Sequence, residues 1–218
     1  PYNADPLSGG RDAVPYDFVE RNRRLRSRSD ITGGLSHLTR SASIDGETLS
    51  AVQVLVRILR ERRLRGSATD GFVTGPTPAV CLFDSPLYAI CEHLDFEYES
   101  KRQPPRYEAA GILIPKEYVY ERRGRPVVYE KREVGKTLLP KNEWWRLVHF
   151  ELSNARLVDW THEREWRVPG DLELELSQVT VLVGNSNLHR EFLAECENTG
   201  ENIAQSVRSF VDLSALYV

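Results

Sequence analysis

The chain has 218 residues, of which 40% are hydrophobic and 28% charged, and its formal net charge is −3. These values are typical of a soluble globular protein that buries a proper core, and they argue against nucleic-acid binding through a general basic excess. The sequence contains no run of apolar residues long enough to cross a membrane, and its start lacks the apolar segment of a signal peptide. We therefore expect no membrane attachment.

Three cysteines, Cys81, Cys91 and Cys196, are scattered along the chain and form no C-x-x-C pair. An odd number of separated cysteines favours a reducing compartment over a disulfide framework. Their spacing also does not match a zinc site. The cysteines therefore predict a cytoplasmic protein.

The first 30 residues are rich in Pro, Gly, Asp and Arg and show little periodicity. They predict an N-terminal arm over 1–30, with a short helix around Tyr16 to Arg26, followed by a single α+β domain over 31–218. The run RNRRLRSR (21–28) carries five arginines. Such a run is either a solvated face or an anion-binding cluster, because arginine forks suit phosphate.

The first half of the predicted domain alternates strands and helices. The segment GGLSHLTR (33–40) alternates apolar and polar residues and predicts a short strand. A long helix is predicted to follow, capped by Asp45 and stopped by Gly66, because apolar residues recur at helical spacing: Leu49, Val52, Leu55, Val56 and Leu59. The apolar run PAVCLFDSPL (78–87) predicts a buried strand that leads into a short helix over LYAICEHL (87–94).

The second half contains most of the predicted strands. A strand at Gly111 to Ile114, a turn or short helix at Lys116 to Tyr120 and a second strand over Gly124 to Tyr129 are expected in turn. WRLVHFEL (145–152), REWRVP (164–169) and QVTVLVG (178–184) are three further strand candidates. A helix over NSNLHREFLAECEN (185–198) and an apolar final segment that docks on the body complete an α+β fold.

The segment DWTHEREWRVPG (159–170) concentrates acids, bases and aromatic residues. If it forms a strand, alternation places Glu163, Glu165 and Arg167 on one face. On a solvated face they form a charge ladder. If that face lines a cleft instead, the glutamate can hydrogen-bond the ribose of a nucleotide, and the arginine can balance the negative charge of its phosphates.

Other candidate residues also have two interpretations each. His37 is either a structural strand histidine or an anchor for a ligand at the edge of the sheet, where Arg40 can neutralise a phosphate. Ser85 follows a buried strand, where it serves as a helix cap or joins a phosphate site at the helix start. Tyr129 is either a cross-strand aromatic or a stacking residue, and Arg125 precedes it on the same predicted strand.

Several catalytic motifs are absent from the sequence: the G-x-S-x-G elbow, the P-loop, G-x-G-x-x-G and H-E-x-x-H. His162-Glu163 lacks the second histidine that zinc requires, so we expect no metal. A metal-dependent nuclease built from scattered acids has no support in their spacing, and its candidate ligands are Asp84, Asp159, Glu163 and Glu165.

In order along residues 35–185, the segments HLTR, LVRILRERRLRGS, VCLFDSPL, GILIPKEYVYERRGRPVVYE, EWWRLV and DWTHEREWRV resemble bacterial abortive-infection or phage-resistance proteins. These proteins share an H-x-T pattern, a G-x-P-V-x-Y strand and a terminal W-x-x-E-x-E-W-R. The resemblance implies a role in anti-phage defence or a toxin system, with a partner protein from that system.

A second resemblance is to ADP-ribosyltransferases, including the DNA-modifying toxins and the RNA 2′-phosphotransferases. It rests on the order of a histidine strand, a helix, a Ser/Asp segment and a glutamate strand. The resemblance implies a mixed-sheet core with a long helix after the first strand. It also implies NAD as the substrate, a nucleic acid or a protein as the acceptor of ADP-ribose, and no metal.

The roles that this resemblance implies can be carried over position by position. Glu165 matches the catalytic glutamate, Glu163 the glutamate on the acceptor side and His37 the ribose anchor. The NAD-binding positions are then Ser85 in the middle motif, Tyr129 for stacking, Arg40 for the pyrophosphate, and the neighbouring Arg125 and Arg167. The sequence departs from the pattern in having FDSP in place of S-T-S, and Ser36 and Leu38 where the histidine commonly has a glycine neighbour.

Three functions follow from the sequence. The first is an NAD-dependent ADP-ribosyltransferase-like enzyme, and the alternative is a non-catalytic recognition or regulatory module of a defence system. A metal-dependent nuclease is the third. The enzyme interpretation predicts that His37, Ser85, Tyr129 and Glu165 converge on a single cleft. It is to be abandoned if Glu163 and Glu165 point into solvent far from His37, so the central question is whether Glu165 faces His37.

Overall fold

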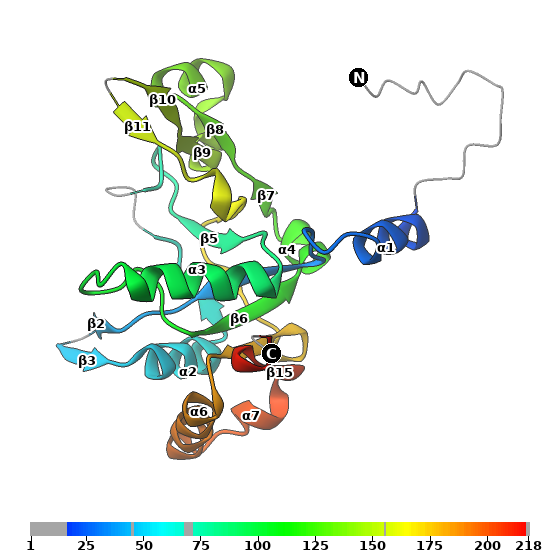
Figure 1. The fold of residues 1–218 in the computed structure, drawn as a ribbon, viewed down its shortest axis with the longest axis vertical. Helices are drawn as coiled ribbons and strands as arrows, with labels where there is room; N and C mark the ends of the chain where they lie inside the picture. The colour runs from blue at the N-terminus through cyan, green and yellow to red at the C-terminus, as the bar shows by residue number, and fades with distance from the viewer. Residues whose placement is uncertain (1–16, 45, 68–71, 155, 217–218) are drawn as a thin grey trace.

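A seven-stranded mixed sheet organises the computed structural model, which describes residues 17–44, 46–67, 72–154 and 156–216 (Figure 1). The strand order is β15-β14-β6-β1-β5-β12-β7. Neighbouring strands are antiparallel except β14 and β15, which are parallel. The strands are β1 (Gly34–Leu38), β5 (Ala79–Phe83), β6 (Ala110–Pro115), β7 (Arg125–Pro126), β12 (Glu165–Pro169), β14 (Thr180–Val183) and β15 (Ser209–Asp212).

Helices pack on both faces of this mostly antiparallel sheet, and the fold is α+β. The two larger hydrophobic cores lie on opposite faces, and a third, smaller cluster contains Val73, Ala79 and Trp145. Because successive strand residues point to opposite faces, Leu82 joins one core and Phe83 the other. The core around Leu82 contains α2 (Ala51–Glu61), α6 (Ser186–Thr199) and α7 (Ile203–Ser206). The core around Phe83 contains α3 (Leu87–Glu99) and the C-terminal turn η4 (Leu213–Leu216), so the final segment docks on the body as expected.

The predicted long helix is shorter than expected at both ends. Its N-cap is Ser50, whose side chain accepts from the Gln53 N–H in a capping box, and its last residue is Glu61. The segment before it forms a hairpin of β2 (Ala42–Ile44) and β3 (Glu47–Leu49). The predicted cap Asp45 lies outside the described residues. After the helix, β4 (Arg63–Leu64) pairs with β13 (Leu172–Glu173), so Gly66 is not the stop.

The predicted strand over Gly124 to Tyr129 is two strands in different sheets. β7 joins the large sheet, whereas β8 (Val128–Glu130) pairs in parallel with β9 (Leu147–His149). Strands β8 and β9 belong to a small group of elements at the top of Figure 1. The group also contains α5 (Arg132–Leu138), η1 (Lys141–Arg146) and the hairpin of β10 (Glu151–Ser153) and β11 (Arg156–Val158). This group lies next to β12.

The predicted strand over 145–152 is also divided: its first two residues end η1, and most of the rest forms β9 and β10, which belong to different sheets. The remaining predictions for secondary structure hold with small changes in bounds. Strands β1, β5, β6, β12 and β14 lie where expected, and Asn185 caps α6 through its side chain. The arm contains α1 (Phe18–Arg26), and α4 (Lys116–Glu121), η2 (Thr161–Glu163) and η3 (Leu176–Gln178) complete the elements. In the part of the chain that the structure describes, none of the helices is both long and apolar enough to span a membrane.

Candidate functional site

A cavity of about 510 Å³ lies beside β1, β5 and β12, with α2 and the loop after α3 forming other parts of its wall. Its volume is within the range of small-molecule sites. Four of the residues predicted from the sequence line it: His37, Arg40, Glu163 and Glu165. The segment 163–165 and the strand of His37 are therefore brought to the same cavity.

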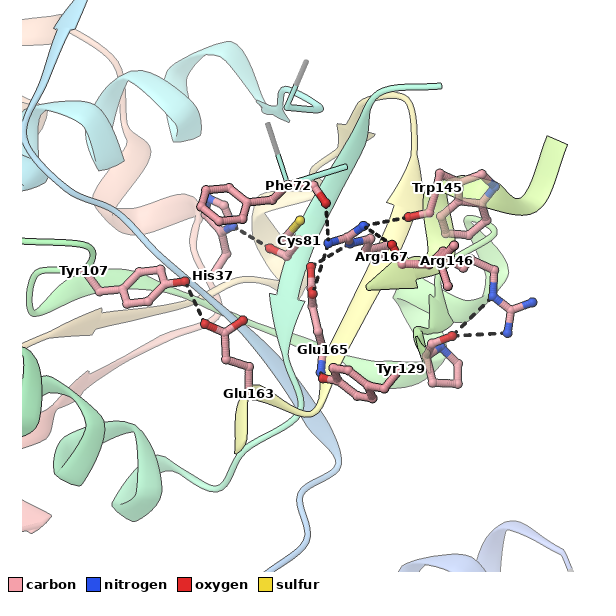
Figure 2. Close-up of polar contacts among 12 residues, drawn as sticks. His37, Phe72, Cys81, Tyr107, Tyr129, Trp145, Arg146, Glu163, Glu165 and Arg167 are labelled. Carbon is pink, nitrogen blue, oxygen red and sulfur yellow. Dashed lines mark hydrogen bonds and ion pairs between the residues drawn. The ribbon is translucent and has the colours of Figure 1, made fainter. Parts of the chain in front are cut away.

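The pairing of β1 explains why His37 reaches this cavity. β1 pairs with β6 along its length, from Gly34↔Pro115 to Leu38↔Gly111. With β5 it pairs at Ser36↔Phe83, the one register pair that the described residues form between these strands. Beyond that pair, His37 Nδ1 lies 2.9 Å from the carbonyl oxygen of Cys81 (Figure 2). The imidazole therefore bridges the two strands where their ladder stops.

The bond to Cys81 fixes the state of the imidazole. A carbonyl only accepts, so Nδ1 carries the hydrogen and Nε2 is left as an acceptor in the neutral ring. Burial lowers the pKa of His37 and so favours this neutral form. The ring is suited to accept a hydroxyl hydrogen from a ligand.

Glu165 is the first residue of β12 and points to the same face as Arg167. The Arg167 guanidinium donates from Nε to Glu165 Oε1 at 2.7 Å and from Nη2 to Oε2 at 3.2 Å (Figure 2). Both residues are buried, with 6% and 1% of their surface exposed. A bidentate arginine–carboxylate ion pair of this kind fixes the orientation of the carboxylate.

Arg167 is bonded entirely within the protein. Besides Glu165, it donates to the carbonyl oxygens of Trp145 and Leu147 from Nη1, at 3.0 and 3.4 Å, and of Phe72 from Nη2, at 3.4 Å. With the two bonds to Glu165 these match the five N–H groups of a guanidinium. The structure therefore places Arg167 as the support of Glu165, rather than as the phosphate ligand expected from the sequence.

Glu163 also reaches the cavity, but not through strand alternation. The prediction of one strand over 164–169 fails at its start, because Glu163 ends η2 and Arg164 adopts a left-handed conformation with φ 47°. The strand begins at Glu165. Glu163 Oε1 accepts a hydrogen bond from the hydroxyl of Tyr107 at 3.1 Å (Figure 2).

Burial and the neighbouring negative charge of Glu165 raise the pKa of Glu163 from 4.5 to about 7. The Tyr107 bond and the nearby Arg106 act in the opposite direction but do not cancel this shift. A carboxyl with such a pKa exchanges its proton near neutral pH. It is therefore suited to act as a general base.

Three of the predicted NAD-binding residues lie elsewhere. Tyr129 accepts the backbone N–H of Glu165 at 2.8 Å and so holds the start of β12. Arg125 lies over the ring of Tyr120, 3.9 Å from its centroid, and donates to backbone carbonyls. Ser85 is buried after β5 and is not part of the cavity lining.

The interpretation of Ser85 as a helix cap is wrong. Pro86 occupies the cap position of α3, without a side-chain cap bond. The Asp84 carboxylate instead pairs with Lys116 at 2.7 Å and accepts from Trp166 Nε1 at 3.1 Å. It links β5 to β12 on the face away from Glu165, because Trp166 and Glu165 are successive strand residues.

Residues that were not predicted from the sequence contribute arginines and aromatic rings to the lining. They come from the loop after α3 and from the segments before β5 and β12: Phe72, Arg102, Arg106, Tyr107 and Trp160. The one available signal was the arginine–tyrosine pair in the Pro-containing loop QPPRY (103–107).

The four acids considered for a metal site do not gather. Asp159 accepts from Thr161, and Asp84 pairs with Lys116, whereas Glu163 and Glu165 face the cavity. Among the described residues, no group of three or more His, Cys, Asp or Glu side chains is placed to hold a metal ion.

Comparison with known proteins identifies no relative. No protein-family model matches the chain, and searches of curated proteins and of solved structures also gave no match.

Proposed function

We propose that the protein is an ADP-ribosyltransferase-like enzyme of a bacterial anti-phage or toxin system, which cleaves NAD and transfers ADP-ribose to an acceptor. The observation that carries the proposal is that His37, Glu163 and Glu165 line one cavity. The sequence resemblance assigns these three residues to the ribose, the acceptor and the reacting bond.

The chemistry of the transfer matches the environment of Glu165. When the bond between nicotinamide and ribose breaks, the electron pair leaves with neutral nicotinamide and positive charge develops on the sugar. A carboxylate held in a buried site stabilises that charge strongly, because it needs no reorganisation. A carboxylate has about four lone-pair positions, so the bonds to Arg167 leave others for the ribose.

The other two residues have separate tasks. Nε2 of His37 accepts a hydrogen bond from a ribose hydroxyl, since Nδ1 is bonded to Cys81. The acceptor attacks the sugar carbon and loses a proton, which Glu163 takes, consistent with its raised pKa. Arg40 is exposed where it lines the cavity, and it can neutralise the pyrophosphate.

The test is the release of nicotinamide from NAD by the purified protein in the presence of single-stranded DNA, RNA or protein acceptors. Glu165→Gln should lower that release by about 100-fold or more, the range found when a transition-state charge contact is removed. Glu163→Gln should retain slow cleavage of NAD by water but lose transfer. The matched control is Glu173→Gln, because the Glu173 side chain is 70% exposed on β13.

Because Glu165→Gln also leaves Arg167 without its counter-ion, the folded fraction of each variant must be measured alongside its activity. Wild-type protein that releases no nicotinamide with any of these acceptors contradicts the proposal. Equal release by Glu165→Gln and the wild type contradicts it as well.

One observation favours the alternative, a non-catalytic recognition or regulatory module: Glu165 is already the counter-ion of a buried arginine. On this interpretation NAD or another ligand binds without being cleaved, and Glu165→Gln leaves protection against phage intact once the loss of stability is allowed for. Charge reversal along Arg21 to Arg28 should then abolish partner binding. In the structure Arg21, Arg24 and Arg28 form ion pairs, with Glu117, Glu20 and Asp30.

A further inference from the structure

The part of the cavity around Glu163 is built from aromatic rings and arginines. The guanidinium of Arg106 lies 4.4 Å from the centroid of the Trp160 ring, and the Phe72 ring meets Trp160 edge-on at 6.5 Å. Tyr107 donates to Glu163 itself. We call Phe72, Arg102, Arg106, Tyr107 and Trp160 the aromatic wall. All five line the cavity with Glu163.

Two rings of the aromatic wall, Tyr107 and Trp160, pack against histidines. His162 lies 5.9 Å from Trp160 between ring centroids, and His93 lies 5.3 Å from Tyr107 and 5.6 Å from His162. Burial lowers the pKa of His93, as does the nearby His162. Packing of ring on ring restricts rotation, so the wall is a prearranged surface for a planar group.

The arginines of this cavity keep their charge available. Within the described ranges, none of Arg40, Arg102 and Arg106 forms an ion pair with a carboxylate. By contrast, Arg57 and Arg60 on α2 and Arg63 and Arg65 just after it all do. Of the two acids in the cavity, Glu165 is neutralised by Arg167 and Glu163 has a raised pKa. The cavity therefore favours a ligand that carries negative charge.

We propose that the aromatic wall binds the acceptor, and that the acceptor is an unpaired base of single-stranded nucleic acid. Proteins bind single-stranded nucleic acid through two features, aromatic rings on which the bases stack and cationic side chains that contact the phosphates. The wall has both. The wall lines the same cavity as Glu163, the residue suited to take the acceptor's proton, and Tyr107 donates to it. That the bound base is the acceptor rests on the proposed function, whereas its binding does not.

The test of binding uses fluorescence anisotropy with labelled single-stranded DNA and RNA of about 12 nucleotides, which spans a typical single-strand groove. The titration is run on the wild type without NAD and on Glu165→Gln with NAD present. A duplex of the same sequence is the comparison, because its bases are paired and cannot stack on the wall. We expect the single strand to bind more tightly than the duplex.

Two sets of variants locate the binding. Trp160→Ala should weaken binding of the single strand by about tenfold, and Trp160→Phe should restore most of it, since any aromatic ring can stack. Arg102→Ala with Arg106→Ala should reduce the salt dependence of log K by roughly 1.4, which corresponds to two lost phosphate contacts. The charge-matched control is Arg190→Ala with Arg208→Ala, because Arg190 lies on α6 and Arg208 directly precedes the edge strand β15, and neither lines the cavity.

The outcomes separate this inference from the proposed function. If single-strand binding depends on Trp160 but no nicotinamide is released, the nucleic-acid site is supported and the proposed transfer reaction is contradicted. Nicotinamide release without binding of either single strand overturns the nucleic-acid site, and a labelled protein in that assay then identifies the acceptor class. Binding that is as tight for the duplex, or is unchanged by the Trp160 and arginine variants, also overturns it.

Discussion

Glu165 and Arg167 face the same side of β12 and form a buried two-point ion pair, with Nε–Oε1 and Nη2–Oε2 distances of 2.7 and 3.2 Å. Arg167 also donates to the carbonyls of Phe72, Trp145 and Leu147, which belong to separate segments of the chain. The pair therefore links β12 of the large sheet to η1, to β9 and to the segment before β5. Removing either member leaves the other charged and buried.

The first prediction concerns this pair. Arg167→Met should lower the free energy of unfolding by about 3–5 kcal/mol, the usual cost of leaving one charge of a buried pair uncompensated. The double variant Glu165→Met with Arg167→Met should lose less than the sum of the single variants, because no charge remains unpaired. Urea denaturation of the four proteins gives the coupling energy. Simple additivity would show that the two side chains act independently.

The second prediction is a dependence of stability on pH through Glu163. Its pKa is raised in the folded protein to about 7 from 4.5, so the folded state holds the proton more tightly than the unfolded chain. Ionisation therefore lowers stability as the pH rises from about 4.5 to about 7. Glu163→Gln, which mimics the protonated acid, should be more stable than the wild type at pH 8, and this advantage should disappear by about pH 4.

Thermal denaturation across that pH range measures the effect, with Glu173→Gln as the exposed control. If the stability advantage of Glu163→Gln does not change with pH, the pKa of Glu163 is not raised in the folded protein.

The third prediction concerns activity and the same carboxyl. If Glu163 is the base for the acceptor, the rate of ADP-ribose transfer rises with pH and levels off above about 7, because only the ionised carboxylate takes the proton. Glu163→Gln should abolish this rise while leaving cleavage of NAD by water. Parallel assays of transfer and of nicotinamide release distinguish the two steps. A rise that survives in Glu163→Gln assigns the titration to another group.

The fourth prediction separates two roles of Tyr129. Tyr129→Phe keeps a ring for stacking but removes the hydroxyl that accepts the Glu165 N–H. Loss of that partner should cost about 1–3 kcal/mol of stability, since the backbone N–H of the buried Glu165 is left unpaired. Denaturation in urea is the measurement. A stacking role would instead leave Tyr129→Phe unchanged in both stability and KM for NAD.

The fifth prediction uses a glycine that lies against His37. A Cβ added at Gly111 would meet the carbonyl oxygen of His37 at 2.3 Å, so Gly111→Ala must displace the strand that carries the imidazole. We expect lower stability and a higher KM for NAD. Gly33→Ala is the control, because its Cβ meets Leu25 at an ordinary 3.5 Å. Unchanged KM in a folded Gly111→Ala protein would place His37 outside NAD binding.

The sequence predicted the elements whose pattern is local. The apolar spacing of Leu55 and Leu59 predicted the middle of α2, although not its ends, and the run of apolar residues predicted β5. The early start predicted for α2 was an error with a visible cause. Asp45-Gly46 is a strong hairpin signal between β2 and β3, and Gly46 has the positive φ of 87° that such a turn requires.

The candidate site was predictable in part for the same reason. His37 and Glu165 could be chosen because each lies on a recognisable strand, and the cavity contains both. Glu163 reaches the cavity through the left-handed turn at Arg164, which alternation does not foresee. The roles of Arg167 and Tyr107 depend on contacts with distant segments, and no local pattern marks a buried arginine or a loop tyrosine as part of a site.

The ion pair has a consequence for how this site can change among related chains. Position 165 is under two requirements, because its carboxylate balances a buried arginine and faces the cavity. Among the described residues Glu163 forms no ion pair, and its raised pKa predicts that its ionised form lowers stability. Exchange of Glu163 alone should therefore be the easier evolutionary route to a new acceptor, whereas Glu165 and Arg167 are expected to be kept or replaced together.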